Sequence, residues 1–504
     1  MTTTTDSGQQ PDPNKLSAGD LPDIQGLIVR GYKLPQVRHF VLTIGDSAAA
    51  ASFLGELTSG SGALSITSAA PWQDAKKPAY ALNLGLTATG LQALRLPGPD
   101  ADPSKKVFFN YGNFQSFLNG AVAAAETVGD TGENAPTNWI EKLKAQNADA
   151  AHLLISLYCT GDTSRDKYSA ILRTMFAKVI PASGEPNSDV LEFDVNALAG
   201  GKIHFGYADG ISNPIIDAQN LPPLRPLQLP YVPAWQFVLR EGDKTTYNMP
   251  TPLGLSQNAS FTAFRILDQN VDAFDAFLKT QGDNEAQEFL AAKLCGRWRN
   301  GNPIVATPDA PGDKLPPNEL RDFLYNEVEG DPSQPDSVGN PCPFSSHTRR
   351  SNARGGPGVT GVHNTPEGRT AHRIMRRANP YGPEHTGQPD GQSRGLAGHF
   401  IGASLFNQFE FLMGQWVNSG TFAGTRKAGL DPLLANVPAD STFTYWKKDE
   451  DTGKDVSVTV DGMSRFVTTK GGMYAMLPSL SALKWMAANS NNTNNPWTIA
   501  NNAT

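Results

Sequence analysis

Strand patterns that are followed at once by helix patterns recur in both halves of the chain. In the first half, AHLLISLYC from Ala151 is a buried-strand pattern, and SRDKYSAILRTMFAKVI after it has helical spacing. In the second half, the strand pattern SFTAFRIL is followed by the helix pattern VDAFDAFLKT. Both halves also contain further short strand patterns. This alternation predicts an α+β fold of two similar units, each with helices on one side of a sheet.

The domain boundaries follow from shifts in composition. Residues 1–20 are polar and predict a disordered arm, whereas residues 486–504 are of low complexity and predict a frayed tail. Between them we expect an N-terminal unit over residues 21–210 and a C-terminal unit over residues 211–485. No short internal repeat is visible, so duplication of one unit stays a hypothesis.

The composition suits a soluble globular protein and limits its partners. The chain has 504 residues, of which 39% are hydrophobic and 18% charged, and its net charge is -7. Because it lacks a Lys/Arg-rich block, we expect no nucleic-acid partner. Polar residues fill the N-terminus and interrupt the most apolar later stretch, so we expect neither a secretory signal nor a membrane span. Three dispersed cysteines predict reduced thiols, which favours the cytoplasm.

The stretch GYADG places Asp209 between two glycines, Gly206 and Gly210. Taken alone, Asp before Gly is typical of a turn, because the Asp side chain bonds nearby backbone N–H groups. A functional interpretation therefore needs support from other parts of the chain.

Two later stretches supply that support: NPCPFSSHTRRSNAR contains His347, and AHRIMRRANPYGP contains Arg376. With DIQG from Asp23, GRWRNGNPI from Gly296 and FNQFEF from Phe406, this ordered set resembles the dye-decolorizing (DyP-type) haem peroxidases. The resemblance implies two ferredoxin-like α+β lobes, similar to a dimeric α+β barrel, with a haem b between them. It implies one haem per chain, and the absence of a Cys-x-x-Cys-His motif predicts that this haem is not covalently attached.

The resemblance also implies roles for individual residues. His347 matches the proximal ligand of the haem iron, and Glu410 is a candidate acceptor for its other ring nitrogen. Asp209 matches the acid–base aspartate that moves a proton between the two oxygens of peroxide. Arg376 matches the arginine that stabilises the developing negative charge, although the sequence does not decide between it and Arg377.

Four further positions are expected near the haem. Gly206 and Gly210 would let the backbone pass close to the porphyrin. Arg349 and Arg354 would bind the haem propionates, because a guanidinium matches a carboxylate bidentately.

The sequence leaves alternatives open for the residues that relay electrons and for those that shape the pocket. Tyr381 and Trp416 are candidate relays to bulky donors, with packing in the core as the alternative. Gly398 stands where the family commonly has Phe, and His399 either faces the pocket or points the other way along its strand.

The function implied is a peroxidase that reduces hydrogen peroxide to water and oxidises aromatic or dye-like donors in one-electron steps. A carboxylate base stays ionised in acid, so an acidic pH optimum is expected. The alternative is a haem carrier or iron-release protein on the same scaffold, which would need only His347 and the pocket. A hydrolase is disfavoured: GQSRG around Ser393 has the spacing of a nucleophile elbow but lies after a Pro/Gly-rich loop.

Overall fold

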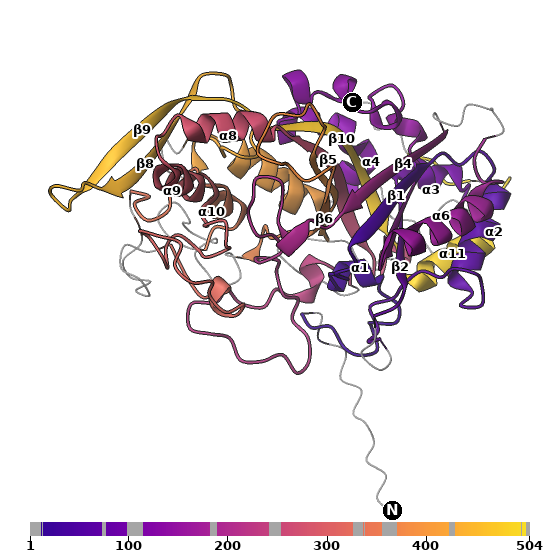
Figure 1. The fold of residues 1–504 in the computed structure, drawn as a ribbon. Helices are drawn as coiled ribbons and strands as arrows, with labels where there is room; N and C mark the ends of the chain where they lie inside the picture. Colours follow the sequence, from indigo (N-terminus) through magenta and orange to yellow (C-terminus); the bar gives the residue numbers. More distant parts are fainter. Residues whose placement is uncertain are drawn as a thin grey trace, which may run out of the picture.

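A single antiparallel sheet of eight strands runs through the centre of the molecule (Figure 1). The computed structural model describes residues 12, 14–72, 77–97, 114–181, 189–240, 254–325, 336, 338–354, 370–422, 429–494 and 496–499. The strand order is β4-β1-β3-β2-β10-β5-β7-β6. The N-terminal four are β1 (Gln36–Leu42), β2 (Tyr80–Leu86), β3 (Leu153–Cys159) and β4 (Val190–Asn196). The C-terminal four are β5 (Ser260–Gln269), β6 (Met375–Tyr381), β7 (Gly395–Gly402) and β10 (Val467–Leu477).

The two halves of this sheet have the same topology. In each half the chain's fourth strand lies beside its first, followed by the third and the second, which is the ferredoxin-like order. One residue pair, Met476 opposite Leu86, joins the halves through β10 and β2. At the other end β4 packs against β6, so the sheet curls round on itself. The predicted α+β architecture of two ferredoxin-like lobes is confirmed.

Helices cover the outer faces of both halves. The N-terminal ones are α1 (Gly26–Val29), α2 (Ser47–Thr58), α3 (Ala88–Ala93), α4 (Gln115–Ala123), α5 (Ala125–Val128) and α6 (Asp162–Phe176). The later ones are α8 (Val271–Lys279), α9 (Asn284–Cys295), α10 (His347–Ser351) and α11 (Leu480–Asn489), with the π-helices η14 (Leu405–Glu410) and η15 (Leu412–Val417). The hairpin of β8 (Ser441–Lys448) and β9 (Asp455–Met463) projects from one end (Figure 1).

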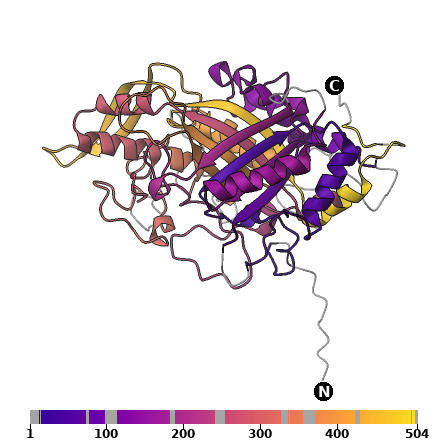
Figure 2. The same cartoon turned by 45° about the vertical axis from the view of Figure 1, so that its right-hand side comes forward.

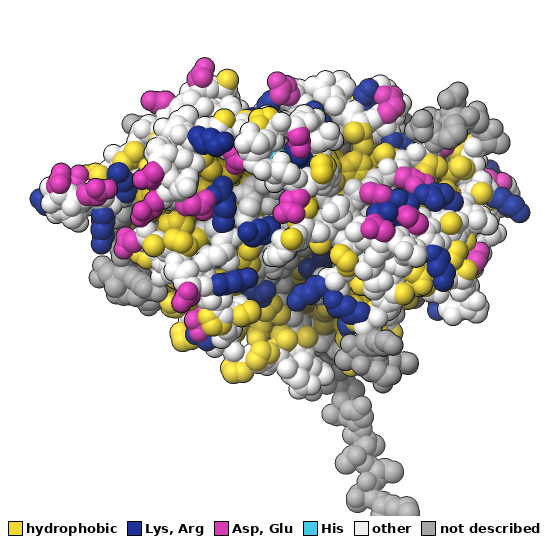
Figure 3. Space-filling model, viewed as in Figure 1, with side chains coloured by type: hydrophobic (Ala, Val, Ile, Leu, Met, Phe, Trp, Pro, Cys, Tyr) yellow, Lys and Arg dark blue, Asp and Glu magenta, His cyan; other side chains and the backbone are white. Residues whose placement is uncertain are grey.

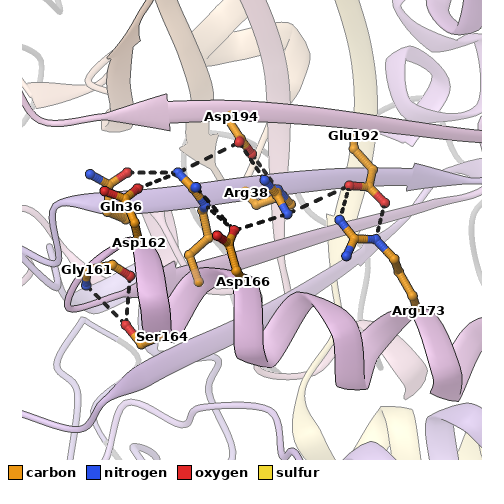
Figure 4. Close-up of polar contacts among 10 residues, drawn as sticks. Gln36, Arg38, Gly161, Asp162, Ser164, Asp166, Arg173, Glu192 and Asp194 are labelled. Carbon is orange, nitrogen blue, oxygen red and sulfur yellow. Dashed lines mark hydrogen bonds and ion pairs between the residues drawn. The ribbon is translucent and has the colours of Figure 1, made fainter.

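Helix α6 shows how an amphipathic pattern becomes packing. It lies across the N-terminal half of the sheet (Figure 2), with Leu172 and Phe176 buried beneath it. Arg38 on β1 forms two hydrogen bonds, of 2.5 and 2.6 Å, with the carboxylate of Asp194 on β4. The same guanidinium lies 3.7 Å from Asp166 of α6 (Figure 4). This ionic network ties β4, β1 and α6 together.

The two chain ends are more ordered than their composition predicts. Residues 1–11 and 13 lie outside the described part, but Leu16 is buried and its N–H donates to the carbonyl of Asp217. In the tail, α11 continues to Asn489 and packs against α2. Trp497 is buried, and its backbone N–H donates to the carbonyl of Leu96. Part of the predicted arm and part of the predicted tail therefore pack against the lobes. The boundary between residues 210 and 211 stays a prediction.

None of the helices in the described part of the chain is long and apolar enough to cross a bilayer.

Candidate functional site

A cavity of about 200 Å³ lies against the C-terminal half of the sheet. Strands β5, β6 and β7 supply Leu267, Ala378 and Phe400 to its wall. Other lining residues come from η14 and η15, from α10 and from the GYADG loop. The cavity brings together three predicted residues that are far apart in sequence: Asp209, His347 and Arg376.

His347 is held by an acidic partner. It opens the short helix α10, and its Nδ1 lies 2.8 Å from Oδ2 of Asp431. Asp431 is fully buried, and its Oδ1 accepts the backbone N–H groups of Leu433 and Leu434 at 2.9 and 3.0 Å. Because a carboxylate oxygen accepts, Nδ1 is the donor, and in the neutral imidazole the lone pair then lies on Nε2. Asp431 therefore orients the ring so that Nε2 is the nitrogen that can bind a metal.

The prediction that Glu410 accepts the hydrogen bond of His347 is wrong. The Oε2 of Glu410 accepts the hydroxyl of Ser116 at 2.8 Å, and Glu410 does not line the cavity. Burial raises the pKa of the Glu410 carboxyl, and the hydrogen bond from Ser116 opposes that rise. On the π-helix η14 its neighbour Phe409 faces the cavity instead. Asp431 was missed because it lies 84 residues from His347 in the chain.

Asp209 and Arg376 form the second charged pair of the cavity. A guanidinium nitrogen of Arg376 lies 3.5 Å from Oδ1 of Asp209, and the two side chains are 34% and 37% exposed. Asn213, four residues after Asp209, accepts the backbone N–H of Arg376 at 2.9 Å and donates to its carbonyl at 3.2 Å. These two bonds fix strand β6 against the loop that carries Asp209.

The side chain of Arg377 points away from the cavity. Its Nε donates to the carbonyl of Leu27 at 3.0 Å, and burial lowers its pKa to about 10. Successive strand residues face opposite sides of a sheet, so only one of the adjacent arginines can face the cavity. That residue is Arg376.

The two glycines of GYADG meet a conformational need. Gly206 and Gly210 have φ values of +87° and +75°, in the left-handed region that other residues rarely adopt. A Cβ on Gly206 would lie 2.9 Å from Cδ of Arg299, whereas one on Gly210 would meet nothing within 4 Å. Neither glycine lines the cavity, so the expectation that they admit a cofactor to the backbone is not supported.

Arg349 and Arg354 do not line the cavity either. Arg349 is buried and bonds to Asp336 at 2.6 Å and to the carbonyl of Cys342. Arg354 donates to the carbonyls of Arg321 and Phe323 at 2.8 and 3.3 Å. Their proximity to His347 in sequence was misleading, because a five-residue helix and the turn after it send these side chains in other directions.

The guanidiniums that line the cavity with Arg376 belong to Arg265, Arg297 and Arg373. Arg265 is bonded to both carboxylate oxygens of Asp130, at 2.6 and 2.5 Å. Burial lowers the pKa of Arg297 to about 10 and of Arg373 to about 9. Neither forms an ion pair with any described carboxylate, which leaves two cationic groups at the wall without a counter-ion.

The two candidate relay residues are buried and do not line the cavity. Tyr381 ends β6, is 8% exposed, and donates its hydroxyl to Oδ1 of Asp268 at 2.9 Å. Burial and Asp268 both raise its pKa. Trp416 lies in η15, 9% exposed, with its ring 5.4 Å from that of Phe411. Their relay role stays a prediction.

His399 faces the opposite side of β7 from the cavity. Its Nε2 lies 2.7 Å from Oγ of Ser156 on β3, and burial lowers its pKa. Gly398 is needed for the close approach of β6, since a Cβ there would lie 2.3 Å from the carbonyl oxygen of Arg377.

These features fit a haem. Among the described residues, Nε2 of His347 has no hydrogen-bond partner, so its lone pair can bind iron. The walls combine apolar groups such as Leu267 and Phe409 with the unpaired guanidiniums of Arg297 and Arg373, which suits an apolar ring bearing carboxylates. Within the described part no group of three His, Cys, Asp or Glu side chains could hold a bare metal ion.

Comparison with known proteins gives a consistent answer, although no family model matches the chain. Peroxidase 2 of Mycetinis scorodonius is 29% identical, over 95% of this chain and 90% of its own length. The multifunctional dye peroxidase DyP2 of an Amycolatopsis species is 30% identical, over 92% of this chain and 95% of its own length. A dye-decolorizing peroxidase solved with 2,6-dimethoxyphenol superposes with a TM-score of 0.71 at 26% identity, over 93% of this chain and 99% of that structure. The chain therefore belongs to the dye-decolorizing (DyP-type) peroxidase family.

Proposed function

We propose that the cavity holds one non-covalent haem b and that His347 is the axial ligand of its iron. The observation that supports this most is that the His347–Asp431 pair and the Asp209–Arg376 pair share one cavity. The bound haem would supply the redox chemistry that reduces hydrogen peroxide and oxidises aromatic or dye-like donors.

Asp209 and Arg376 have different roles in the cleavage of peroxide. The Asp209 carboxylate takes a proton from one peroxide oxygen and returns it to the other, which leaves as water. The Arg376 guanidinium stabilises the negative charge that develops on the departing oxygen. Their 3.5 Å separation lets both groups contact one small molecule.

The carboxylate base sets the expected pH dependence. An unperturbed Asp titrates near about 3.9 and an unperturbed His near about 6.5, so a carboxylate base still accepts a proton at a pH where a histidine is already protonated. We expect dye oxidation to be fastest in acid. A pH–rate profile that peaks well above neutrality would contradict Asp209 as the base.

Tyr381 is proposed as the relay to donors too bulky for the cavity. Its hydrogen bond to Asp268 provides an acceptor for the phenolic proton when the ring loses an electron. Tyr381→Phe is then expected to slow the oxidation of a large dye and to leave that of a small phenol unchanged. Equal loss for both donors would indicate a packing role.

The test of the function is haem titration of the purified protein followed by absorption spectroscopy. We expect a Soret band that saturates at one haem per chain and that changes on addition of peroxide. His347→Ala should alter the band, whereas His385→Ala, which removes a histidine bonded to Asp272 outside the cavity, should not. No Soret band, or one that His347→Ala leaves unchanged, would refute the proposal. A Soret band that peroxide does not alter would indicate a carrier.

A further inference from the structure

The side chain of Arg350 joins the helix that carries His347 to the turn that carries Asp431. Arg350 is fully buried and lies three residues after His347 on α10, so the two side chains leave the helix on the same side. The Arg350 guanidinium donates to four backbone carbonyls from three separate segments of the chain. These carbonyls belong to Phe344, Trp416, Ser419 and Gly429.

Two of these carbonyls lie beside the place where the Asp431 turn is attached to η15. Trp416 is in the last turn of η15, where the carbonyls lack partners inside the helix. The backbone N–H of Asp431 donates to the carbonyl of the following residue, Val417, at 3.1 Å. Gly429 lies two residues before Asp431. Arg350 therefore holds both the end of η15 and the start of the Asp431 turn against α10.

The charge of Arg350 is buried without a direct counter-ion. Within the described part of the chain, no carboxylate forms an ion pair with it. Burial lowers the pKa of Arg350 to about 10, and the negative charge of Asp431 opposes that change. A buried cation that is held by carbonyls alone is costly. Its attraction to Asp431 offsets part of that cost and draws the turn toward α10.

The position of the turn decides the geometry of the His347–Asp431 hydrogen bond. The Asp431 carboxylate is fixed within its own turn, because it accepts the backbone N–H groups of Leu433 and Leu434. Its distance to His347, 2.8 Å, therefore depends on where the whole turn lies relative to α10. Hydrogen bonds weaken steeply as their distance and angle depart from the optimum, so a displaced turn would weaken this one.

We propose that Arg350 is a positioning residue for the axial ligand: it fixes the Asp431 turn against α10 and thereby sets the electron density on Nε2 of His347. A strong hydrogen bond from Nδ1 to a carboxylate makes an imidazole a better electron donor to a metal. This inference rests on the proposed function, in which Nε2 of His347 binds the haem iron.

Resonance Raman spectroscopy of the reduced, haem-loaded protein tests the proposal, because the iron–histidine stretching frequency rises with the electron density on the axial nitrogen. Asp431→Asn replaces the carboxylate by a weaker, neutral acceptor and so defines the shift for a weakened hydrogen bond. Arg350→Met should lower the frequency by about half of that shift or more. Arg350→Lys, which keeps the charge but lacks the planar fork, should lower it less.

Arg349→Met is the matched control. Arg349 is the next residue on α10 and is also buried, but it bonds to Asp336 and to the carbonyl of Cys342 instead. This variant should keep the wild-type frequency. Equal frequencies in Arg350→Met and the wild type, or equal shifts in the Arg349 and Arg350 variants, would overturn the proposal. If Arg350→Met does not retain haem, the same comparison is made with Arg350→Lys and Arg349→Lys.

Two further outcomes separate this inference from the proposed function. A frequency that rises in Arg350→Met would mean that Arg350 acts on Asp431 through its charge and not through position, and would overturn the inference alone. An iron–histidine band that is absent from the wild type would contradict the haem site itself.

Discussion

Arginines are used differently in two regions of this molecule, the surface over α6 and the wall of the cavity. Over α6 and the strands beneath it, acidic and basic side chains alternate, and Arg38, Arg165 and Arg173 each pair with a carboxylate (Figures 3 and 4). Around the cavity, Arg297 and Arg373 have no carboxylate partner among the described residues. Elsewhere on the same face, Lys and Arg side chains gather around a hollow (Figure 3).

The difference follows from burial. A surface network is screened by water, so its charges can pair without large gain or loss. A buried guanidinium without a partner is costly, and the pKa values of Arg297 and Arg373, lowered by burial to about 10 and 9, reflect that cost. At the cavity wall, the two arginines without a carboxylate partner are therefore candidates to bind a ligand, whereas the paired arginines over α6 hold elements together.

Arg265 is an exception, because it lines the cavity and yet is paired with a carboxylate. Replacing it gives the largest expected effect on stability. It lines the cavity but is bonded to both oxygens of Asp130, and both residues are buried. Arg265→Met should lower the free energy of unfolding by about 3–5 kcal/mol, because it leaves a buried carboxylate unpaired. Urea denaturation measures this. A loss below about 1 kcal/mol would show that the pair is not structural.

Arg376 should behave in the opposite way, with a large kinetic effect and a small effect on stability. Arg376→Met should slow the reaction with peroxide by about 10²–10³-fold, because the developing charge loses its guanidinium. As the side chain is 34% exposed, unfolding by urea should change little. Stopped-flow mixing with peroxide supplies the rate, and an unchanged rate would remove Arg376 from the chemistry.

Arg38 should give the smallest effect. Its partners Asp194 and Asp166 are 43% and 60% exposed, so Arg38→Met should cost about 1 kcal/mol or less in urea denaturation. Its rate with peroxide should equal that of the wild type. A loss as large as that of Arg265→Met would contradict the contrast between surface and cavity.

The fold and the grouping of Asp209, His347 and Arg376 at one cavity could be predicted from the sequence, but the side chains that hold and neighbour them could not. The periodicity of apolar residues predicts strands and helices. The ordered motifs predicted that Asp209, His347 and Arg376 lie around one cavity. The acceptor Asp431 depends on a contact that no local pattern encodes. Arg349 is only two residues from His347, yet its side chain points to Asp336. A short separation in sequence therefore predicted that Arg349 lies near His347, but it did not predict where the Arg349 side chain points.

The most direct test of the site is the rate at which the haem-loaded Asp209→Asn variant reacts with hydrogen peroxide at acidic pH. The asparagine side chain has the same shape but cannot take a proton, so we expect a rate about 10²–10⁴-fold below that of the wild type with the Soret band unchanged before mixing. A variant that reacts at the wild-type rate would contradict the assignment of Asp209 as the group that moves the proton.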